Sequence, residues 1–284
     1  MKRELFYKIR KINEIVQLRF KHDNKLFIDP YLIKETESEL LARAKQKIIK
    51  FFELFFQCIE QKDIKTVEMM GKYLHEINAT KLGYGAERNS SGGKGFCQKD
   101  LLHIFNESIK IRDYIEDMID VLIFTQNVGP DKISDLTTNI IYEELLEYTT
   151  YIIDKYNLEI EFKKKNKWTF NVENKCWEKK RMLVPFIDNE EILFLPESIV
   201  SSRQIFSYEK VYRNLVFPFY KANIRSRKFI RIAKNGEEVL DCKKLRKEYP
   251  LTRNTVKDFR IRYPEVYRKY KTEIKEDCLG ERTD

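Results

Sequence analysis

The chain has 284 residues, of which 42% are hydrophobic and 13% aromatic, and a formal net charge of +9 at pH 7. This composition supports a substantial hydrophobic core and excludes a disordered protein. No apolar run approaches the roughly 18 residues of a membrane-spanning helix, and the charged N-terminal sequence predicts no signal peptide.

Cysteine and histidine usage indicates the cellular setting and excludes some sites. The five cysteines are scattered without C-x-x-C spacing, so neither a disulfide framework nor a zinc site is predicted. We therefore expect a reducing cytoplasm. The three histidines stand alone in the sequence, and no metal site is predicted on them.

Positive charge is concentrated near the C-terminus. Residues 221–274 contain 17 Lys and Arg against 7 Asp and Glu, whereas residues 1–220 contain 35 against 34. The sequence therefore predicts a nearly neutral body, residues 1–220, and a small basic unit, residues 221–284. Clustered cations attract polyanions, so nucleic acid is the expected partner. The alternative is a charged surface that is only solvated.

The first half of the chain alternates predicted helices with turns. Residues 25–33 predict a short strand that ends at Asp29-Pro30. Residues 35–60 predict a helix, because apolar residues recur at spacings of three and four, and its buried face includes Leu41, Ile48, Phe52 and Phe55.

A glycine-rich segment, residues 84–95, predicts a flexible loop over residues 85–95. Its spacing matches neither a Walker loop nor a dinucleotide fingerprint, although Lys94 can contact a phosphate backbone. Helical spacing returns over residues 100–123.

The middle of the chain predicts one long helix and several strands. Gly129-Pro130 interrupts the chain, and Ser134 or Asp135 is expected to cap a helix over residues 136–156. Strand-like pieces follow at residues 158–162, 167–172 and 192–195. The predicted fold class is therefore α+β, with a helix-rich mixed body and a small sheet.

The basic unit predicts a hairpin followed by two short helices. Asn235-Gly236 favours a type I′ turn within a β-hairpin over residues 228–240. Helices are expected at residues 242–248 and 253–262, the second capped by Thr252. On this second helix the candidate nucleic-acid-binding residues are Arg253, Asn254, Lys257 and Arg260, as in a helix-turn-helix reader. A helical hairpin with a solvated charged face is the alternative.

Carboxylates supply the candidate catalytic site. Asp131, which follows Pro130, together with Glu161 and Lys163 gives the P-D…E-x-K order of metal-dependent nucleases, with Asp29 and Asp135 as further ligands of Mg²⁺ or Mn²⁺. The long predicted helix between Asp131 and Glu161 argues against this arrangement. The alternatives are a turn residue for Asp131, a helix cap for Asp135 and a solvated strand face for Glu161 and Lys163.

Several segments resemble a bacterial family of uncharacterised proteins from mobile, phage-defence-like gene neighbourhoods. They are residues 129–141, 146–149, 168–177, 192–200 and 249–270. The resemblance covers about the last 160 residues and implies no catalytic residue. It implies an antiviral setting, in which other defence-system subunits are possible partners.

Two functions are consistent with these patterns. The first is a metal-dependent nuclease effector whose body holds the carboxylates and whose basic unit holds DNA or RNA. The second is a non-catalytic nucleic-acid-binding or adaptor protein.

Overall fold

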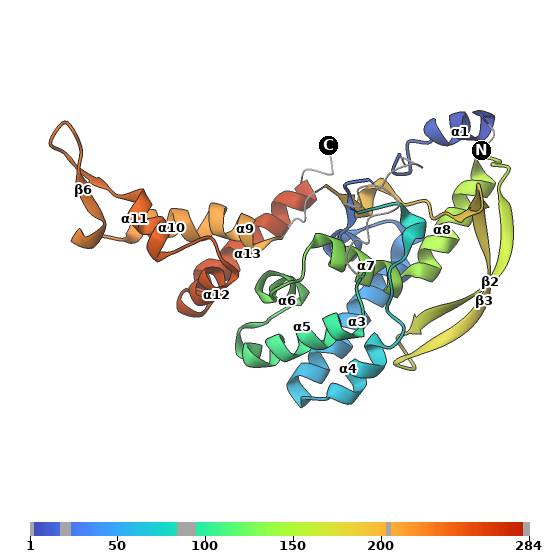
Figure 1. The fold of residues 1–284 in the computed structure, drawn as a ribbon, viewed down its shortest axis with the longest axis horizontal. Coiled ribbons are helices and arrows are strands. Elements are labelled where there is room, and N and C mark those ends of the chain that lie inside the picture. The colour runs from blue at the N-terminus through green and yellow to red at the C-terminus, as the bar shows by residue number, and fades with distance from the viewer. Residues whose placement is uncertain (1–2, 18–23, 84–94, 203–205, 281–284) are drawn as a thin grey trace. The chain divides into compact units, whose positions relative to one another are not determined.

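The computed structural model describes residues 3–17, 24–83, 95–202 and 206–280 (Figure 1). The fold is helix-rich and mixed α+β, as predicted, and the described strands form three small antiparallel sheets. The chain divides into two compact units. Unit 1 comprises Met1–Arg112 and Asn127–Ile205, and unit 2 comprises Asp113–Gln126 and Phe206–Asp284. The boundary expected at residue 220 falls inside a helix of unit 2.

Helices form most of unit 1. Their bounds are α1 (Arg3–Arg10), α2 (Pro30–Glu35), α3 (Ala42–Gln61), α4 (Ile64–Gly71), α5 (Gln98–Lys110), α7 (Pro130–Ile140) and α8 (Tyr142–Lys155). The predicted apolar face of α3 is confirmed, because Leu41, Ile48, Phe52 and Phe55 are all buried. Aromatic edge-to-face contacts join this face to other elements, such as Phe51 to Phe170 with ring centroids 5.1 Å apart.

The expected start of the long central helix is wrong. Gly129 is the N-cap of α7 and Pro130 occupies its first turn, so Ser134 and Asp135 lie inside the helix instead of capping it. Proline at the first helical position already has the required φ and needs no hydrogen-bond partner for its nitrogen. The helical segment is also divided, because α7 ends at Ile140 and α8 begins at Tyr142.

A long hairpin is the main β structure of unit 1. Strand β2 (Glu161–Asn171) pairs antiparallel with β3 (Cys176–Ile187), and β3 pairs with the short β4 (Glu190–Glu191). Two of the predicted strand pieces therefore overlap one continuous strand, β2. Residues 192–195 are buried but lie in no strand. A second small sheet joins β1 (Phe27–Ile28) to β5 (Val200–Ser201).

Unit 2 contains the basic elements predicted at the C-terminal end. Its helices are α6 (Met118–Phe124), α9 (Tyr208–Val211), α10 (Phe217–Asn223), α11 (Cys242–Glu248), α12 (Arg253–Arg262) and α13 (Pro264–Gly280). A π-helical turn, Tyr212–Val216, joins α9 to α10 just before Pro218. Pro218 has no backbone N–H to donate, and its ring clashes with the carbonyl one turn earlier in a regular α-helix. The wider π-helical turn relieves this clash.

The predicted hairpin is confirmed, with a different turn. Strands β6 (Ile230–Ile232) and β7 (Glu238–Leu240) pair around Ala233–Glu237, and of the turn residues Gly236 has a positive φ of 84°. The Gly236 amide donates to the Ala233 carbonyl, and the Ala233 amide donates to Glu237. This geometry is a turn followed by a glycine bulge instead of the expected type I′ turn, which requires positive φ at both central residues.

Candidate functional site

The side chains expected to read nucleic acid from α12 make internal contacts. Arg253 donates to the carbonyls of Leu122 and Ile123, at 2.9 and 2.8 Å, at the end of α6. Arg260 is only 2% exposed and its Nη2 lies 2.6 Å from Oε1 of Glu116. The expectation of an exposed basic face containing Arg253 and Arg260 is therefore corrected, because both side chains fasten α12 within unit 2.

The other two candidates on α12 remain accessible. Asn254 is exposed and its Oδ1 accepts from Gln126, while Lys257 is half-buried. Only two of the four side chains predicted to bind nucleic acid are therefore accessible on α12. The alignment of Arg253, Lys257 and Arg260 in the sequence could not show this, since their partners come from residues 116–123.

The exposed charge of unit 2 lies mainly on another segment. We define the hairpin–α11 segment as residues 227–248, which includes β6, β7 and α11. Within the described residues, seven of its exposed cations make no ion pair: Arg227, Arg231, Lys234, Lys243, Lys244, Arg246 and Lys247. Asp241 caps α11 by accepting from the backbone amides of Lys243 and Lys244, and both lysines are exposed.

Two of the predicted metal ligands belong to a carboxylate cluster on unit 1. Asp131 and Asp135 lie one turn apart on α7. Burial raises the pKa of Asp135 to about 7. A hydrogen bond from the Phe96 amide opposes this shift, and the charges of Asp131, Glu76 and Asp100 add to it.

Two glycines allow the backbone to approach this cluster. A Cβ at Gly95 would lie 2.5 Å from Cβ of Glu76 and 3.0 Å from Oδ2 of Asp135. Gly83 has φ of +131°, and a Cβ there would lie 3.3 Å from Asp131. These glycines flank the predicted loop, and its candidate Lys94 lies outside the described residues.

The remaining carboxylate candidates lie on other elements. Asp29 is the N-cap of α2 and accepts from the Tyr31 amide at 2.9 Å. Glu161 is exposed at the start of β2, 3.6 Å from Lys163, whose Nζ donates to Asn189. Among the residues that the structure describes, no group of three His, Cys, Asp or Glu side chains is arranged to hold a metal ion. The predicted Mg²⁺ or Mn²⁺ site therefore gains no support from this geometry.

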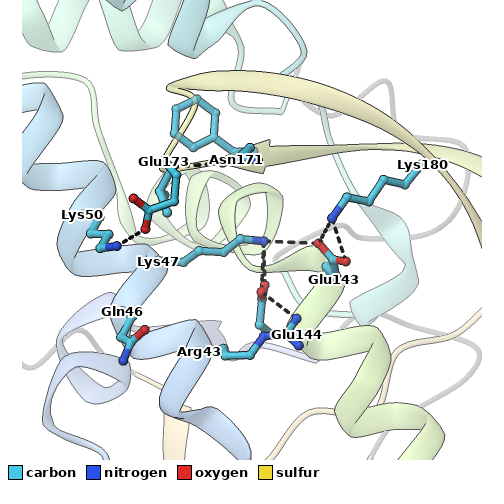
Figure 2. A pocket seen from close by; sticks show the side chains of 11 residues that line it. Arg43, Gln46, Lys47, Lys50, Glu143, Glu144, Asn171, Glu173 and Lys180 are labelled. Atoms are coloured by element: carbon cyan, nitrogen blue, oxygen red, sulfur yellow. Dashed lines mark hydrogen bonds and ion pairs between the residues drawn. The ribbon is translucent and has the colours of Figure 1, made fainter.

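Sequence reasoning missed a polar pocket of about 410 Å³ on unit 1 (Figure 2). It is lined by residues of α3, α8 and the β2–β3 hairpin: Arg43, Gln46, Lys47, Lys50, Glu143, Glu144, Phe170, Asn171, Val172, Glu173 and Lys180. Lys47 lies between Glu143 and Glu144, and Lys180 pairs with Glu143 (Figure 2). Lys50 pairs with Glu173 and Arg43 with Glu144. The lysines and the arginine that line the pocket are thus already paired with carboxylates. These ion pairs connect α3, α8 and the β2–β3 hairpin.

A signal for part of this pocket is present in the sequence. Arg43, Lys47 and Lys50 recur at spacings of four and three, which places them along one side of α3. Their carboxylate partners lie about 100 or more residues further along the chain, and local spacing cannot identify them.

The chain belongs to a family whose model is described as a domain of unknown function (DUF8370) and matches residues 8–207. A search of curated proteins and a search of solved structures found no match. The match contains α3, α7, α8 and the β2–β3 hairpin. It excludes residues 249–270, one of the segments on which the C-terminal resemblance rests. Among the described residues, no helix has both the length and the apolar composition needed to cross a membrane.

Proposed function

We propose that this protein binds nucleic acid through the exposed cations of the hairpin–α11 segment. The observation that carries the proposal is a contrast within unit 2. Arg253 and Arg260 of α12 contact other residues of the unit, whereas the exposed cations of the hairpin–α11 segment make no ion pair apart from Lys228. Unpaired cations are free to replace the counterions condensed on a phosphate backbone, and the release of those counterions favours binding.

The shape of β6–β7 also supports this function. A two-stranded ribbon fits the major groove of duplex DNA. Arg231 and Lys234 lie on the ribbon and its turn, and Ile232 between them is 72% exposed. An exposed apolar side chain flanked by cations is suited to contact a base edge or a sugar while the charges contact phosphates.

Removal of two charges from the hairpin tests the proposal. We expect Arg231→Gln with Lys234→Gln to weaken duplex binding and to reduce the slope of log affinity against log salt by about 1.8, because each lost phosphate contact contributes about 0.9. Fluorescence anisotropy with a labelled duplex over a salt series measures both. The control is Arg268→Gln with Lys269→Gln, which removes two cations that are paired with Glu116, Glu265 and Glu273. Equal slopes in the two variants would place the contact elsewhere.

A metal-dependent nuclease is the other predicted function and stays a prediction. It requires Asp131 and Glu161 to act together, although one lies on α7 and the other on β2. Incubation of the protein with DNA and RNA in Mg²⁺ or Mn²⁺ tests it, with Asp131→Asn and Glu161→Gln as variants. Metal-dependent cleavage that both variants abolish would favour an enzyme over a binding protein. The predicted role in phage defence, alone or with other subunits, likewise stays a prediction.

A further inference from the structure

The two faces of the β2–β3 hairpin differ in their environment. Residues that pair across antiparallel strands lie on the same face, and successive residues alternate between faces. The register pairs Lys164 with Leu183, Asn166 with Arg181 and Trp168 with Lys179, so these six side chains share one face. We call Lys164, Asn166, Lys179, Arg181 and Leu183, which are all exposed, the outer face of the hairpin.

Three of the four cations on the opposite face form ion pairs within unit 1. Lys167 lies 2.6 Å from Glu191, and Lys180 lies 2.9 Å from Glu143 on α8. Lys163 pairs with Glu161 at 3.6 Å. On the outer face, by contrast, Lys164, Lys179 and Arg181 make no ion pair with any described residue. The fourth cation of the opposite face, Lys165, makes no ion pair with any described residue and lies 5.6 Å from the centroid of the Phe186 ring. Three of the four cations on that face are therefore paired, whereas none of the three on the outer face is.

Aromatic rings adjoin these unpaired cations. Trp168, the cross-strand partner of Lys179, stacks on Tyr73 with ring centroids 3.7 Å apart and an interplanar angle of 12°. Both rings are half-buried. Lys72 places another ammonium 5.3 Å from the Tyr73 centroid. Cations beside half-exposed aromatic rings are the combination that binds nucleic-acid strands without sequence preference.

We propose that the outer face of the β2–β3 hairpin is a second nucleic-acid contact, which binds the phosphate backbone of a DNA or RNA strand. Charge complementarity selects this partner, because three unpaired cations are gathered on one exposed strand face with no carboxylate among its five residues. Side chains on one face of a strand repeat at about 6.6–6.8 Å, so Lys179 and Arg181 can contact separate phosphates. The site lies within the family domain and does not depend on the hairpin–α11 segment.

The test removes the three charges in the full chain. Lys164→Gln, Lys179→Gln and Arg181→Gln together should weaken binding of labelled single-stranded and duplex oligonucleotides at least about tenfold at low salt, and reduce the duplex salt slope by roughly 2–3. The matched control is Lys62→Gln, Lys65→Gln and Lys99→Gln, which removes three exposed cations from α4, α5 and the end of α3. A loss confined to the outer-face variant supports the proposal, and an equal or absent loss overturns it.

Two further measurements separate lost charge from altered structure, and nucleic acid from an acidic protein. The charge-retaining variant Lys164→Arg, Lys179→Arg and Arg181→Lys should bind as the wild-type protein does, and a loss of binding in this variant would indicate a structural effect.

Competition with polyglutamate tests the class of partner. If polyglutamate competes as well as nucleic acid at equal charge, the choice of partner is overturned in favour of an acidic protein. The two proposals can fail independently. If only the hairpin–α11 proposal is wrong, Arg231→Gln with Lys234→Gln will keep wild-type affinity, while the outer-face variant will bind more weakly.

Discussion

At the scale of single residues, Asp135 makes a contribution to the free energy of unfolding that depends on pH. Its folded-state pKa of about 7 lies above the unfolded value of about 3.9, mainly because the side chain is buried. Between these two pH values the folded protein binds more protons than the unfolded chain does. The contribution of this group to stability therefore decreases as pH rises from about 4 to 7, and the full penalty is present above about pH 7.

Asp135→Asn removes this penalty. The amide oxygen can still accept from Phe96, while no charge remains to desolvate. We expect stabilisation of about 1–3 kcal/mol above pH 7, because solvent screens part of the shift, and little change near pH 4. Thermal melts at both pH values measure it. Asp131→Asn on the same helix is the control, and its effect should be smaller since this residue is exposed. An equal gain for Asp135→Asn at both pH values would contradict this account.

At the scale of elements, a buried ion pair joins α6 to α13. Lys271 lies 2.9 Å from both carboxylate oxygens of Asp120, which also accepts from Tyr267 at 2.8 Å. Asp120 is 0% exposed and Lys271 has 5% of its side chain exposed. Burial raises the pKa of Asp120 although Lys271 opposes the shift. This pair is thus costly to break from one side.

Replacement of Lys271 measures that cost. Lys271→Met leaves the carboxylate of Asp120 buried without its cation, and we expect a loss of about 3–5 kcal/mol in the free energy of unfolding. Lys269→Met on the same helix removes an exposed lysine 3.8 Å from Glu273 and should cost below about 0.5 kcal/mol. Adding Asp120→Asn to Lys271→Met should recover part of the loss. Similar denaturant midpoints for the two lysine variants would show that the pair contributes little.

Local signals in the sequence predicted some elements well. The N-cap at Thr252 and the prolines at 250 and 264 bounded α11 and α12, and apolar spacing identified the buried face of α3. Strand β3 was missed because Glu178–Arg181 is a run of charged residues without alternation. Its strand conformation follows from pairing with β2, a contact that the sequence alone does not show.

The candidate site was harder to predict than the fold. Helical spacing correctly aligned Arg253 and Arg260, but whether such a face meets solvent depends on neighbours such as Glu116, 144 residues earlier than Arg260. The same limit applies to the carboxylates, because Glu76 and Asp100 approach Asp135 from other elements. Residue type and spacing could identify candidates, whereas burial and pairing came from tertiary structure.

At the scale of the whole molecule, net charge conceals local charge. Residues 1–220 are nearly neutral in sum, yet they contain the exposed, unpaired cations of the outer face of the β2–β3 hairpin. Other lysines of that hairpin are paired with carboxylates of unit 1, such as Lys167 with Glu191 and Lys180 with Glu143. Each unit therefore carries exposed, unpaired cations of its own.

The two units also provide separate reporters of unfolding. Both tryptophans, Trp168 and Trp177, lie in unit 1, so their fluorescence follows this unit, while far-ultraviolet circular dichroism follows the helices of both. Phe52 is buried on α3, next to Phe51 with ring centroids 5.9 Å apart. We expect Phe52→Ala to cost about 3–5 kcal/mol and to shift the tryptophan-detected transition to lower denaturant.

The comparison of the two variants tests whether the units are independent. If the two units unfold independently, Lys271→Met should shift only the part of the circular dichroism transition that comes from unit 2. The transition detected by tryptophan fluorescence should keep its midpoint. The chain enters unit 2 near residue 113 and returns to unit 1 near residue 127, so loss of unit 2 structure leaves a flexible insertion in unit 1. Such an insertion costs little, because loop-closure entropy grows slowly with length. A tryptophan midpoint that moves with Lys271→Met would instead show that the two units unfold as one cooperative structure.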